Sequence, residues 1–353
     1  MEIKNRTIVL LIQAAIAVTV IQCLPVKPDK KMAAAQHTFQ NPLLSSGPDP
    51  WVIQKDGFYY YMHTEGNRIT IHKTKTLSKL KQAEKTVVYR SPASGPDAKN
   101  LWAPELHLIN DKWYIYYTAG ATADFATQRL FVLENISLDP TQGTWTKKGQ
   151  IKDKNADFFA IDATVSNIRG KNYIFWSGHK SATDKTQRLY VAELSEPWKM
   201  KTAAVQISAP IYAWEQIGNP HVNEGPEILK NRKGYVFLIY SASGCWTDDY
   251  SLGMLSLKRN SDPLIATNWT KTPQPIFRQS PGNGAYGPGH NGFFKSPDGK
   301  EDWIIYHANS KPGQQCSNER NPRIQQFTWN ADGSPNLGAP VKINTPINTP
   351  SGE

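Results

Sequence analysis

The chain has 353 residues, with a hydrophobic content of 39% and an aromatic content of 11%, which is enough for a substantial core and excludes a disordered protein. Its net charge is +10, but Lys and Arg are scattered singly, many of them at predicted turns such as those at Lys55, Lys112 and Lys171. A nucleic-acid-binding protein gathers its basic residues into one patch or stripe. We therefore expect no nucleic-acid partner.

Residues 1–35 have the composition of a signal peptide followed by a short tether. Lys4 and Arg6 precede an almost uncharged run over residues 7–24, which is the order found in secretory signals. The run is also about long enough to cross a membrane as a retained anchor. Cys23 ends the run where a bacterial lipoprotein carries its acylated cysteine, although the residue before it is larger than usual. We expect a secreted or periplasmic protein, with a lipid anchor at Cys23 as the alternative.

After residue 36 the chain consists of short aromatic and β-branched runs separated by Gly, Asn, Asp and Lys turns, which is typical of an all-β protein. One unit recurs five times: a strand that opens on a polar residue, a tight turn, an aromatic strand, a variable loop and a third strand. The first two strands of the copies lie at 49–64, 102–120, 162–178, 224–244 and 289–310. Segments 144–151 and 268–277 between copies have the pattern of fourth, outer strands.

Such units cannot bury both of their faces alone, and arranged radially they form a propeller with short, protected edges. A β-sandwich would not require five copies of one strand order. The sequence therefore predicts an all-β fold, a five-bladed β-propeller that forms a single domain over residues 36–353. We expect residues 36–48 and the C-terminal tail to help close the ring.

Carboxylates recur at the start of the innermost strands, which line the channel of a propeller. Asp162 and Glu224 each precede an aromatic residue of the next strand by eleven positions, and Asp49 precedes one by ten. Trp102 occupies this position in the second copy and His290 in the fifth. Single acids at strand starts are more often turn residues, but three acids converging on one channel favour a catalytic site.

Cleavage of a glycosidic bond requires one carboxylic acid that protonates the leaving oxygen and one carboxylate that activates water or attacks the anomeric carbon. Like charges in a shared cleft raise the pKa of one member, which keeps it protonated near neutrality. Residues on different blades of a wide channel leave space for a water molecule, which favours inversion over a covalent intermediate. The pattern thus predicts a glycoside hydrolase with Asp49, Asp162 and Glu224 as catalytic residues.

Several segments, in order along residues 40–345, resemble glycoside hydrolase family 43, and most closely its arabinan-directed α-L-arabinofuranosidase branch. They are DPWV, WAPELH, YIYYTAG, IDATV, NEGPEIL and YGPGHNGFFKSPDGKEDWIIYHA. The resemblance implies an inverting enzyme that releases L-arabinofuranose from arabinan or arabinoxylan side chains of the plant cell wall. It also implies a monomer whose chemistry needs no cofactor.

The resemblance implies a role for each carboxylate. Asp49 matches the family's general base and Glu224 its general acid. Asp162 matches the aspartate that raises the pKa of the acid and orients it.

Three further residues are matched as substrate-binding residues. His290 matches a histidine at the channel centre, often beside a hydrated cation, so a calcium ion bound to His290 through water is expected there. The arginine that helps hold the sugar matches Arg323, with Arg320 as the alternative. Trp102 is expected to form an apolar wall beside the sugar, since sugar faces stack on aromatic rings.

Other polar residues near the repeats are expected to be structural. Glu227 and Glu105 lie three residues after Glu224 and Trp102, an offset that in a plain strand points them to the opposite face. Cys245 and Cys316 follow the aromatic strands of adjacent blades, and an even number of cysteines in an exported protein predicts a disulfide between them.

Two other functions remain open at this stage. One is an endo-arabinanase or a β-xylosidase built on the same propeller, since loop lengths decide exo or endo action. The other is a carbohydrate-binding propeller without catalysis, which would be expected to lack at least one of the three acids.

Overall fold

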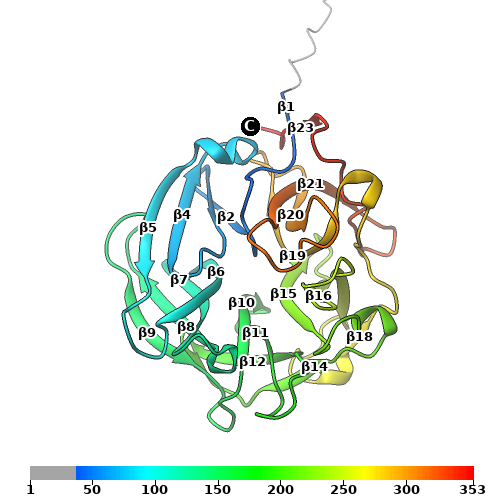
Figure 1. Cartoon of the computed structure of the whole chain (residues 1–353). Helices are drawn as coiled ribbons and strands as arrows, with labels where there is room; N and C mark the ends of the chain where they lie inside the picture. Colours follow the sequence, from blue (N-terminus) through cyan, green and yellow to red (C-terminus); the bar gives the residue numbers. More distant parts are fainter. Residues whose placement is uncertain (1–36) are drawn as a thin grey trace, which may run out of the picture. The chain divides into compact units, whose positions relative to one another are not determined.

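The computed structural model describes residues 37–353, which form five antiparallel sheets arranged as the blades of a β-propeller (Figure 1). The predicted fold class and the number of blades are confirmed. The predicted signal peptide and tether, including Cys23, lie outside the described residues. No helix among residues 37–353 is long and apolar enough to cross a membrane.

The blades follow one another along the chain, and each starts with its innermost strand. Blade 1 contains β2 (Trp51–Lys55), β3 (Phe58–Met62), β4 (Arg68–Thr74) and β5 (Glu84–Arg90). Blade 2 contains β6 (Lys99–Ile109), β7 (Lys112–Gly120), β8 (Arg129–Asn135) and β9 (Thr146–Ile151). Blade 3 contains β10 (Ala160–Ile168), β11 (Lys171–Gly178) and β12 (Arg188–Glu196), with both β13 (Lys199–Met200) and β14 (Val205–Ser208) paired to β12.

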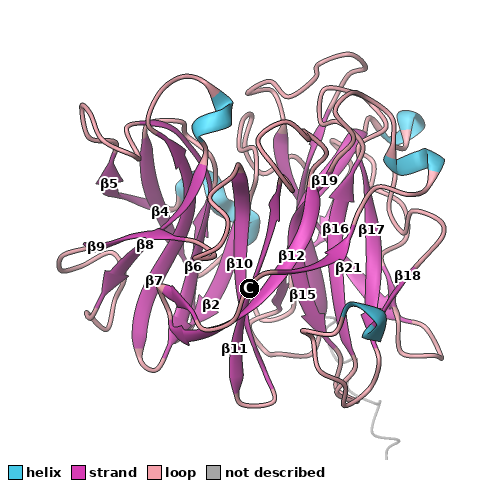
Figure 2. Ribbon diagram, turned by 90° about the horizontal axis from the view of Figure 1, so that it is seen from below, coloured by secondary structure: helices cyan, strands magenta, loops and turns pink. Residues whose placement is uncertain are grey.

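The last two blades have the same order. Blade 4 contains β15 (Asn223–Lys230), β16 (Val236–Ala242), β17 (Ser251–Leu257) and β18 (Trp269–Lys271). Blade 5 contains β19 (Tyr286–Lys295), β20 (Asp302–Asn309), β21 (Asn321–Trp329) and β22 (Pro335–Asn336). The expected outer strands at 144–151 and 268–277 are thus present as β9 and β18. Apart from short 3-10 helices, the described chain is made of strands and loops (Figure 2).

The first two strands of three blades are joined by two-residue turns in which both residues have positive φ. These turns are Asp56-Gly57, Asn110-Asp111 and Arg169-Gly170. Such turns match the right-handed twist of the flanking strands, and they favour Gly, Asn and Asp. The second strands that follow are buried on both faces, which explains why they read as continuous apolar and aromatic runs rather than as alternating patterns.

The hydrophobic core is divided into five clusters, one between each pair of adjacent blades. The cluster between blades 5 and 1 includes Tyr59, Leu77, Trp303 and Ile324, all of them buried. Each blade therefore packs against both of its neighbours.

Closure brings the two ends of the propeller together. β1 (Thr38–Phe39) pairs antiparallel with β23 (Ile347–Asn348), and the two lie side by side at one edge of the ring in Figure 1. The backbone N–H groups of Leu43 and Gly47 donate to the carbonyl oxygens of Pro322 and Arg320 in and beside blade 5. The expected contribution of residues 36–48 and the C-terminal tail to ring closure is confirmed for the described part.

Candidate active site

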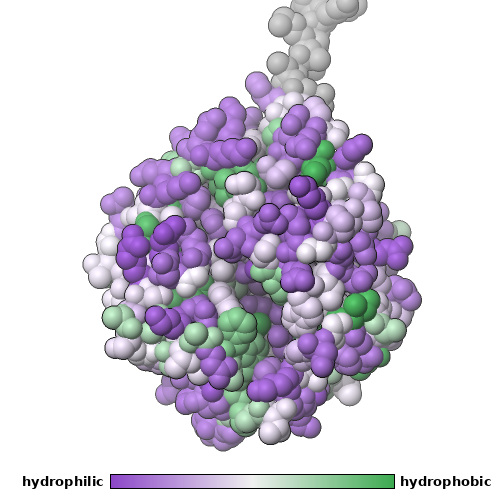
Figure 3. Space-filling model, viewed as in Figure 1, coloured by the Kyte–Doolittle hydropathy of each residue, from purple (hydrophilic) through white to green (hydrophobic). Residues whose placement is uncertain are grey.

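The structure brings the three predicted carboxylates together. Asp49, Asp162 and Glu224 line one cleft of about 560 Å³ at the channel, and Trp102 and His290 line the same cleft. The three carboxyl residues are buried, with exposed fractions of 9%, 5% and 9%. Figure 3 shows that the centre of the ring is hollowed, with hydrophobic residues along part of the rim.

The innermost strands of blades 2 to 5 each carry a two-residue β-bulge at the cleft, where two residues oppose one residue of the second strand. In blades 2 to 5 the bulges lie between the paired residues 102/105, 161/164, 224/227 and 289/292. The first bulge residue in each of blades 2 to 5 has a positive φ, and so does Asp49 at the equivalent place just before β2; the four bulge residues are Ala103, Asp162, Gly225 and His290. A bulge re-aims side chains locally, so residues before and within it both face the cleft.

The bulges correct the predicted register. Asp162 and His290 share the first bulge position and Asp49 has the equivalent one, whereas Trp102 and Glu224 lie one residue before it. The sequence count from the aromatic strand assigned Asp162 and Glu224 to the same position in their blades. The count was off by one residue because blade 4 has a longer turn between its first two strands: β15 ends at Lys230 and β16 begins only at Val236.

The surroundings of Asp49 favour its ionised form. Arg320 Nη1 lies 3.0 Å from Asp49 Oδ1, and the Thr64 hydroxyl donates to Asp49 Oδ2 at 2.7 Å. Burial acts to raise the pKa of Asp49, but Arg320, the neighbouring histidines and the Thr64 hydrogen bond hold it well below its usual range. Asp49 is therefore a carboxylate that can accept a proton.

Glu224 lies in the opposite electrostatic situation. Burial raises the pKa of Glu224 to about 7, and the charge of Asp49 acts in the same direction against the Tyr250 hydrogen bond. The Tyr250 hydroxyl lies 2.8 Å from Glu224 Oε1. Because a tyrosine hydroxyl both donates and accepts, this contact is compatible with a protonated Glu224.

Asp162 is coupled to Glu224. Burial and the Glu224 charge raise the pKa of Asp162 well above its usual value. The two carboxyls therefore hold a proton between them near neutrality. The backbone N–H of Gly225 donates to Asp162 Oδ2 at 3.0 Å, and a backbone N–H cannot accept. This bond favours Asp162 as the ionised member and Glu224 as the protonated one.

In four of the five blades, a side chain in or just after the second strand accepts a bond from the first backbone N–H of the cleft position in the next blade, a support that was not predicted. The bulge N–H groups of Ala103, Asp162 and His290 donate to hydroxyl oxygens of Thr64, Thr118 and Ser241, and the Asp49 N–H donates to His307 Nδ1 at 3.0 Å. A signal for this was present in the repeats: the segments YMHT, YYT, FWS, IYS and IYH each place a hydroxyl residue or His at the same point. Burial lowers the pKa of His307 well below its usual value, so its Nδ1 is free to accept.

The structure corrects the choice of arginine. The guanidinium of Arg323 is fully buried and donates to Asn321 Oδ1 and to the carbonyl oxygens of Gly284 and Asn309, away from the cleft. Arg320 lines the cleft and contacts Asp49. Arg323 is therefore a structural residue of blade 5, and Arg320 is the cleft arginine.

Aromatic side chains form one wall of the cleft, as predicted for Trp102. Its ring packs edge-on against Phe125, which is 59% exposed, with 4.9 Å between the ring centroids. Phe159 and Trp246 also line the cleft. These rings provide apolar surface on which a sugar face can stack.

The metal prediction at His290 gains no support from the protein side chains. No group of three or more His, Cys, Asp or Glu residues placed to hold a metal ion occurs within residues 37–353. His290 Nδ1 faces Asp49 Oδ1 at 3.5 Å, so one ring nitrogen is already directed at the carboxylate. Calcium at this position stays a prediction.

Glu105 and Glu227 are buried beside the inner strands rather than turned outward. Burial and the neighbouring Glu105 raise the pKa of Glu227 well above its usual value, and His107 Nε2 lies 2.9 Å from Glu105 Oε2. Neither residue is among those that line the cleft, and Glu227 interacts with Glu105 of blade 2 and Thr164 of blade 3, which agrees with the expected role in supporting a neighbouring blade.

The predicted disulfide between Cys245 and Cys316 is present, and it joins the loop after β16 to the loop after β20 at the rim of the cleft. The two cysteines are 71 residues apart. Closing a loop of this length lowers the entropy of the unfolded chain, which is worth about 2–4 kcal/mol. We expect the double variant Cys245→Ser/Cys316→Ser to lose about that much free energy of unfolding in urea titrations. Alkylation of both thiols in unreduced wild-type protein would contradict the disulfide.

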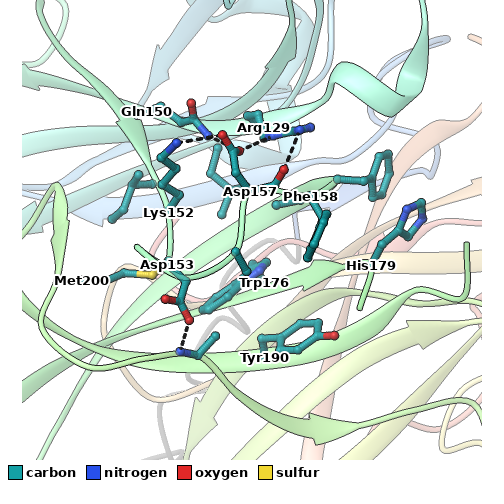
Figure 4. Close-up of a pocket in the computed structure, with 16 residues that line it drawn as sticks. Arg129, Gln150, Lys152, Asp153, Asp157, Phe158, Trp176, His179, Tyr190 and Met200 are labelled. Carbon is teal, nitrogen blue, oxygen red and sulfur yellow. Dashed lines mark hydrogen bonds and ion pairs between the residues drawn. The ribbon is translucent and has the colours of Figure 1, made fainter. Parts of the chain in front are cut away.

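A smaller hollow lies between blades 2 and 3 and shares Phe159 with the cleft. Its volume is about 60 Å³, which suits water molecules rather than a sugar. Figure 4 shows Asp157 at this hollow, accepting hydrogen bonds from Arg129, Gln150 and Lys152. These contacts tie the 152–159 loop to blade 2 and so fix the Phe159 side of the cleft.

Comparison with known proteins gives close relatives. The chain is 41% identical over 317 residues to an extracellular exo-α-(1→5)-L-arabinofuranosidase of Streptomyces avermitilis, covering 88% of this chain and 65% of that protein. It is 39% identical to a protein of the same name from Streptomyces chartreusis, covering 76% of this chain and 82% of that protein. The chain thus spans slightly less than two thirds of the length of the Streptomyces avermitilis relative.

The fold comparison agrees. The crystal structure of an α-L-arabinofuranosidase from Lactobacillus brevis matches with a TM-score of 0.81 and 36% identity, covering 87% of this chain and 98% of that one. The family model described as glycosyl hydrolases family 43 matches residues 39–335, which include all five blades and the three cleft carboxylates. By fold and by sequence, this chain belongs to glycosyl hydrolase family 43.

Proposed function

We propose that the protein is an exo-acting, inverting α-L-arabinofuranosidase that releases L-arabinofuranose from the side chains of plant cell-wall polysaccharides. The observation that carries the proposal is the contrast between two buried carboxyls in one cleft: Arg320 lies 3.0 Å from Asp49 and helps to lower its pKa, whereas burial raises the pKa of Glu224 to about 7. An ionised carboxylate and a protonated acid are the pair that glycosidic cleavage requires.

In the proposed reaction, Asp49 takes a proton from a water molecule whose oxygen attacks the anomeric carbon. Glu224 gives its proton to the departing glycosidic oxygen as the bond to the anomeric carbon breaks. Asp162 holds the neighbouring charge that keeps the proton on Glu224, and Trp102 and Arg320 position the sugar. After product release, Asp49 returns its proton to solvent and Glu224 regains one.

The choice of an exo-acting arabinofuranosidase is supported by the names of the relatives. Those at 37–41% identity are named exo-α-(1→5)-L-arabinofuranosidase or α-L-arabinofuranosidase. Proteins named probable arabinan endo-1,5-α-L-arabinosidase are only 26–27% identical. Activity on internal bonds of debranched arabinan, or on aryl β-xylosides in preference to aryl α-L-arabinofuranosides, would contradict the proposal.

We also propose that the protein is exported through the signal in residues 1–35. Two of the relatives are named extracellular. N-terminal sequencing of the protein secreted by a host cell tests this, because the mature chain should begin after the apolar run, between residues 25 and 36.

The pH dependence follows from Glu224. The general acid works only when protonated, so kcat/KM should fall about tenfold for each pH unit above a midpoint near 7. The hydrogen bond from Tyr250 lowers the pKa of Glu224. Tyr250→Phe should therefore move this midpoint to higher pH, as measured with an arabino-oligosaccharide, whose leaving oxygen needs protonation. A midpoint that moved to lower pH would contradict the assignment of the acid.

A further inference from the structure

A second groove opens from the active-site cleft over blade 1. It has a volume of about 470 Å³, within the range of ligand-binding sites. It runs over one face of β4 and β5 beside residues 44–46. Ser46, His63, Glu65 and Arg68 line both this groove and the cleft, so the two are continuous.

The groove carries an excess of positive charge. Its single carboxylate, Glu65, is neutralised by Arg68, whose Nη2 lies 2.8 Å from Glu65 Oε1, and accepts a further bond from Thr70. Lys81, Lys85 and Arg90 also line the groove. Within residues 37–353 none of these three has a carboxylate oxygen within 4.0 Å. The groove thus presents three cations that the fold does not neutralise.

Two imidazoles in the groove lack the partners that buried polar groups normally have. Nδ1 of His63 and Nδ1 of His72 are buried without a hydrogen-bond partner in the described structure, and His72 is only 3% exposed. Their rings lie 5.4 Å apart and both belong to the groove lining. Buried ring nitrogens are ordinarily satisfied, so these two point to a polar ligand.

We propose that this groove binds a uronic acid residue of the polysaccharide, next to the arabinofuranose being released. The uronate carboxylate lies between Lys85 and Arg90, which line the groove, and the buried rings of His63 and His72 form its polar floor. The inference rests on the proposed function and narrows its substrate class. The preferred substrates carry arabinofuranose on or close to an acidic backbone, rather than in long neutral arabinan chains.

The test compares acidic and neutral substrates. Wild type, Lys85→Gln/Arg90→Gln and the control Lys233→Gln, an exposed lysine at the β15–β16 turn outside the groove, are assayed on arabinofuranosylated oligosaccharides with and without a neighbouring uronate. Each exposed ion pair is worth about 2- to 5-fold in affinity. We expect wild type and the control to favour the acidic substrate, and the double variant to lose about 4- to 25-fold of that preference. Neutral substrates should be cleaved equally by all three.

Direct titration with trigalacturonate and with a glucuronate-bearing xylo-oligosaccharide separates the groove from the catalytic proposal. Binding of either to wild type and the control, weakened in the double variant and by added salt, supports the groove and identifies the uronate. If neither binds, or the double variant binds both as wild type does, the groove proposal is overturned even when arabinofuranosides are cleaved. If no arabinofuranoside is cleaved, the proposed function fails, and the titration still decides on the groove.

Discussion

Glu224→Gln is expected to lower kcat on arabinan by about 10²–10⁴-fold, the range that one general acid contributes. The glutamine amide keeps the size of the side chain but cannot give a proton to the leaving oxygen. Tyr250 can still donate to the amide oxygen, so the fold of the cleft should be retained. The measurement is the initial rate of arabinose release, with the exposed Glu196→Gln as the matched control variant.

The leaving group separates loss of the acid from general damage. In an aryl arabinofuranoside with an acidic phenol, the phenolate leaves without being protonated. Glu224→Gln should therefore retain much of its activity on that substrate. Equal losses on arabinan and on the activated aryl substrate would show that Glu224 is not the acid. Full activity on arabinan would contradict the mechanism outright.

Asp49→Asn is expected to lower kcat by a similar factor, about 10²–10⁴-fold, on every substrate. The amide cannot take a proton from the attacking water, and a better leaving group does not replace that step. The substitution would also place a neutral group against Arg320, which now lies 3.0 Å from a carboxylate oxygen. KM for arabinofuranosides should change less than kcat, because Trp102 and the rest of the cleft remain.

The two variants are therefore expected to respond differently to the leaving group. Glu224→Gln should retain activity on the activated aryl substrate, and Asp49→Asn should not. If Asp49→Asn retained its activity on the substrate with the good leaving group, Asp49 would be the acid and Glu224 the base.

Much of the fold could be predicted because the repeat is local. The two-residue turns such as Asp56-Gly57 and the doubly buried second strands leave clear patterns in the sequence. What the pattern did not reveal was the bulge in the inner strands of blades 2 to 5, since a bulge adds a residue without changing composition. The predicted alignment of Asp162 with Glu224 was off by one residue because the turn between β15 and β16 is longer than the turn between β10 and β11.

The three carboxylates of the site could be predicted from the sequence, but the residues that contact them could be predicted less well. Arg320 and Arg323 lie three residues apart in the sequence. Only the structure shows that the guanidinium of Arg323 donates its hydrogen bonds to backbone carbonyl oxygens and so does not face the cleft. Tyr250 comes directly before the third strand β17, a position held by Gln128, Gln187 and Arg320 in other blades, so no repeated residue type marked it. The hydroxyl positions Thr64 and Thr118 did carry such a signal.

The protonation states could not be predicted from residue types. Asp49 and Asp162 occupy equivalent positions in two blades, yet their pKa values are shifted in opposite directions. The difference arises because Arg320 reaches Asp49 from blade 5, while Asp162 faces Glu224. Charges delivered by other blades therefore decide the direction in which each pKa is shifted.

The most direct test of the central claim is proton NMR of the first arabinose released from an α-L-arabinofuranoside by the wild-type enzyme. With Asp49 as base and Glu224 as acid in an inverting reaction, β-L-arabinofuranose should appear first and the α anomer only later, by mutarotation. If the α anomer appeared first, the reaction would proceed with retention, and the assignment of Asp49 as a base acting through water would be contradicted.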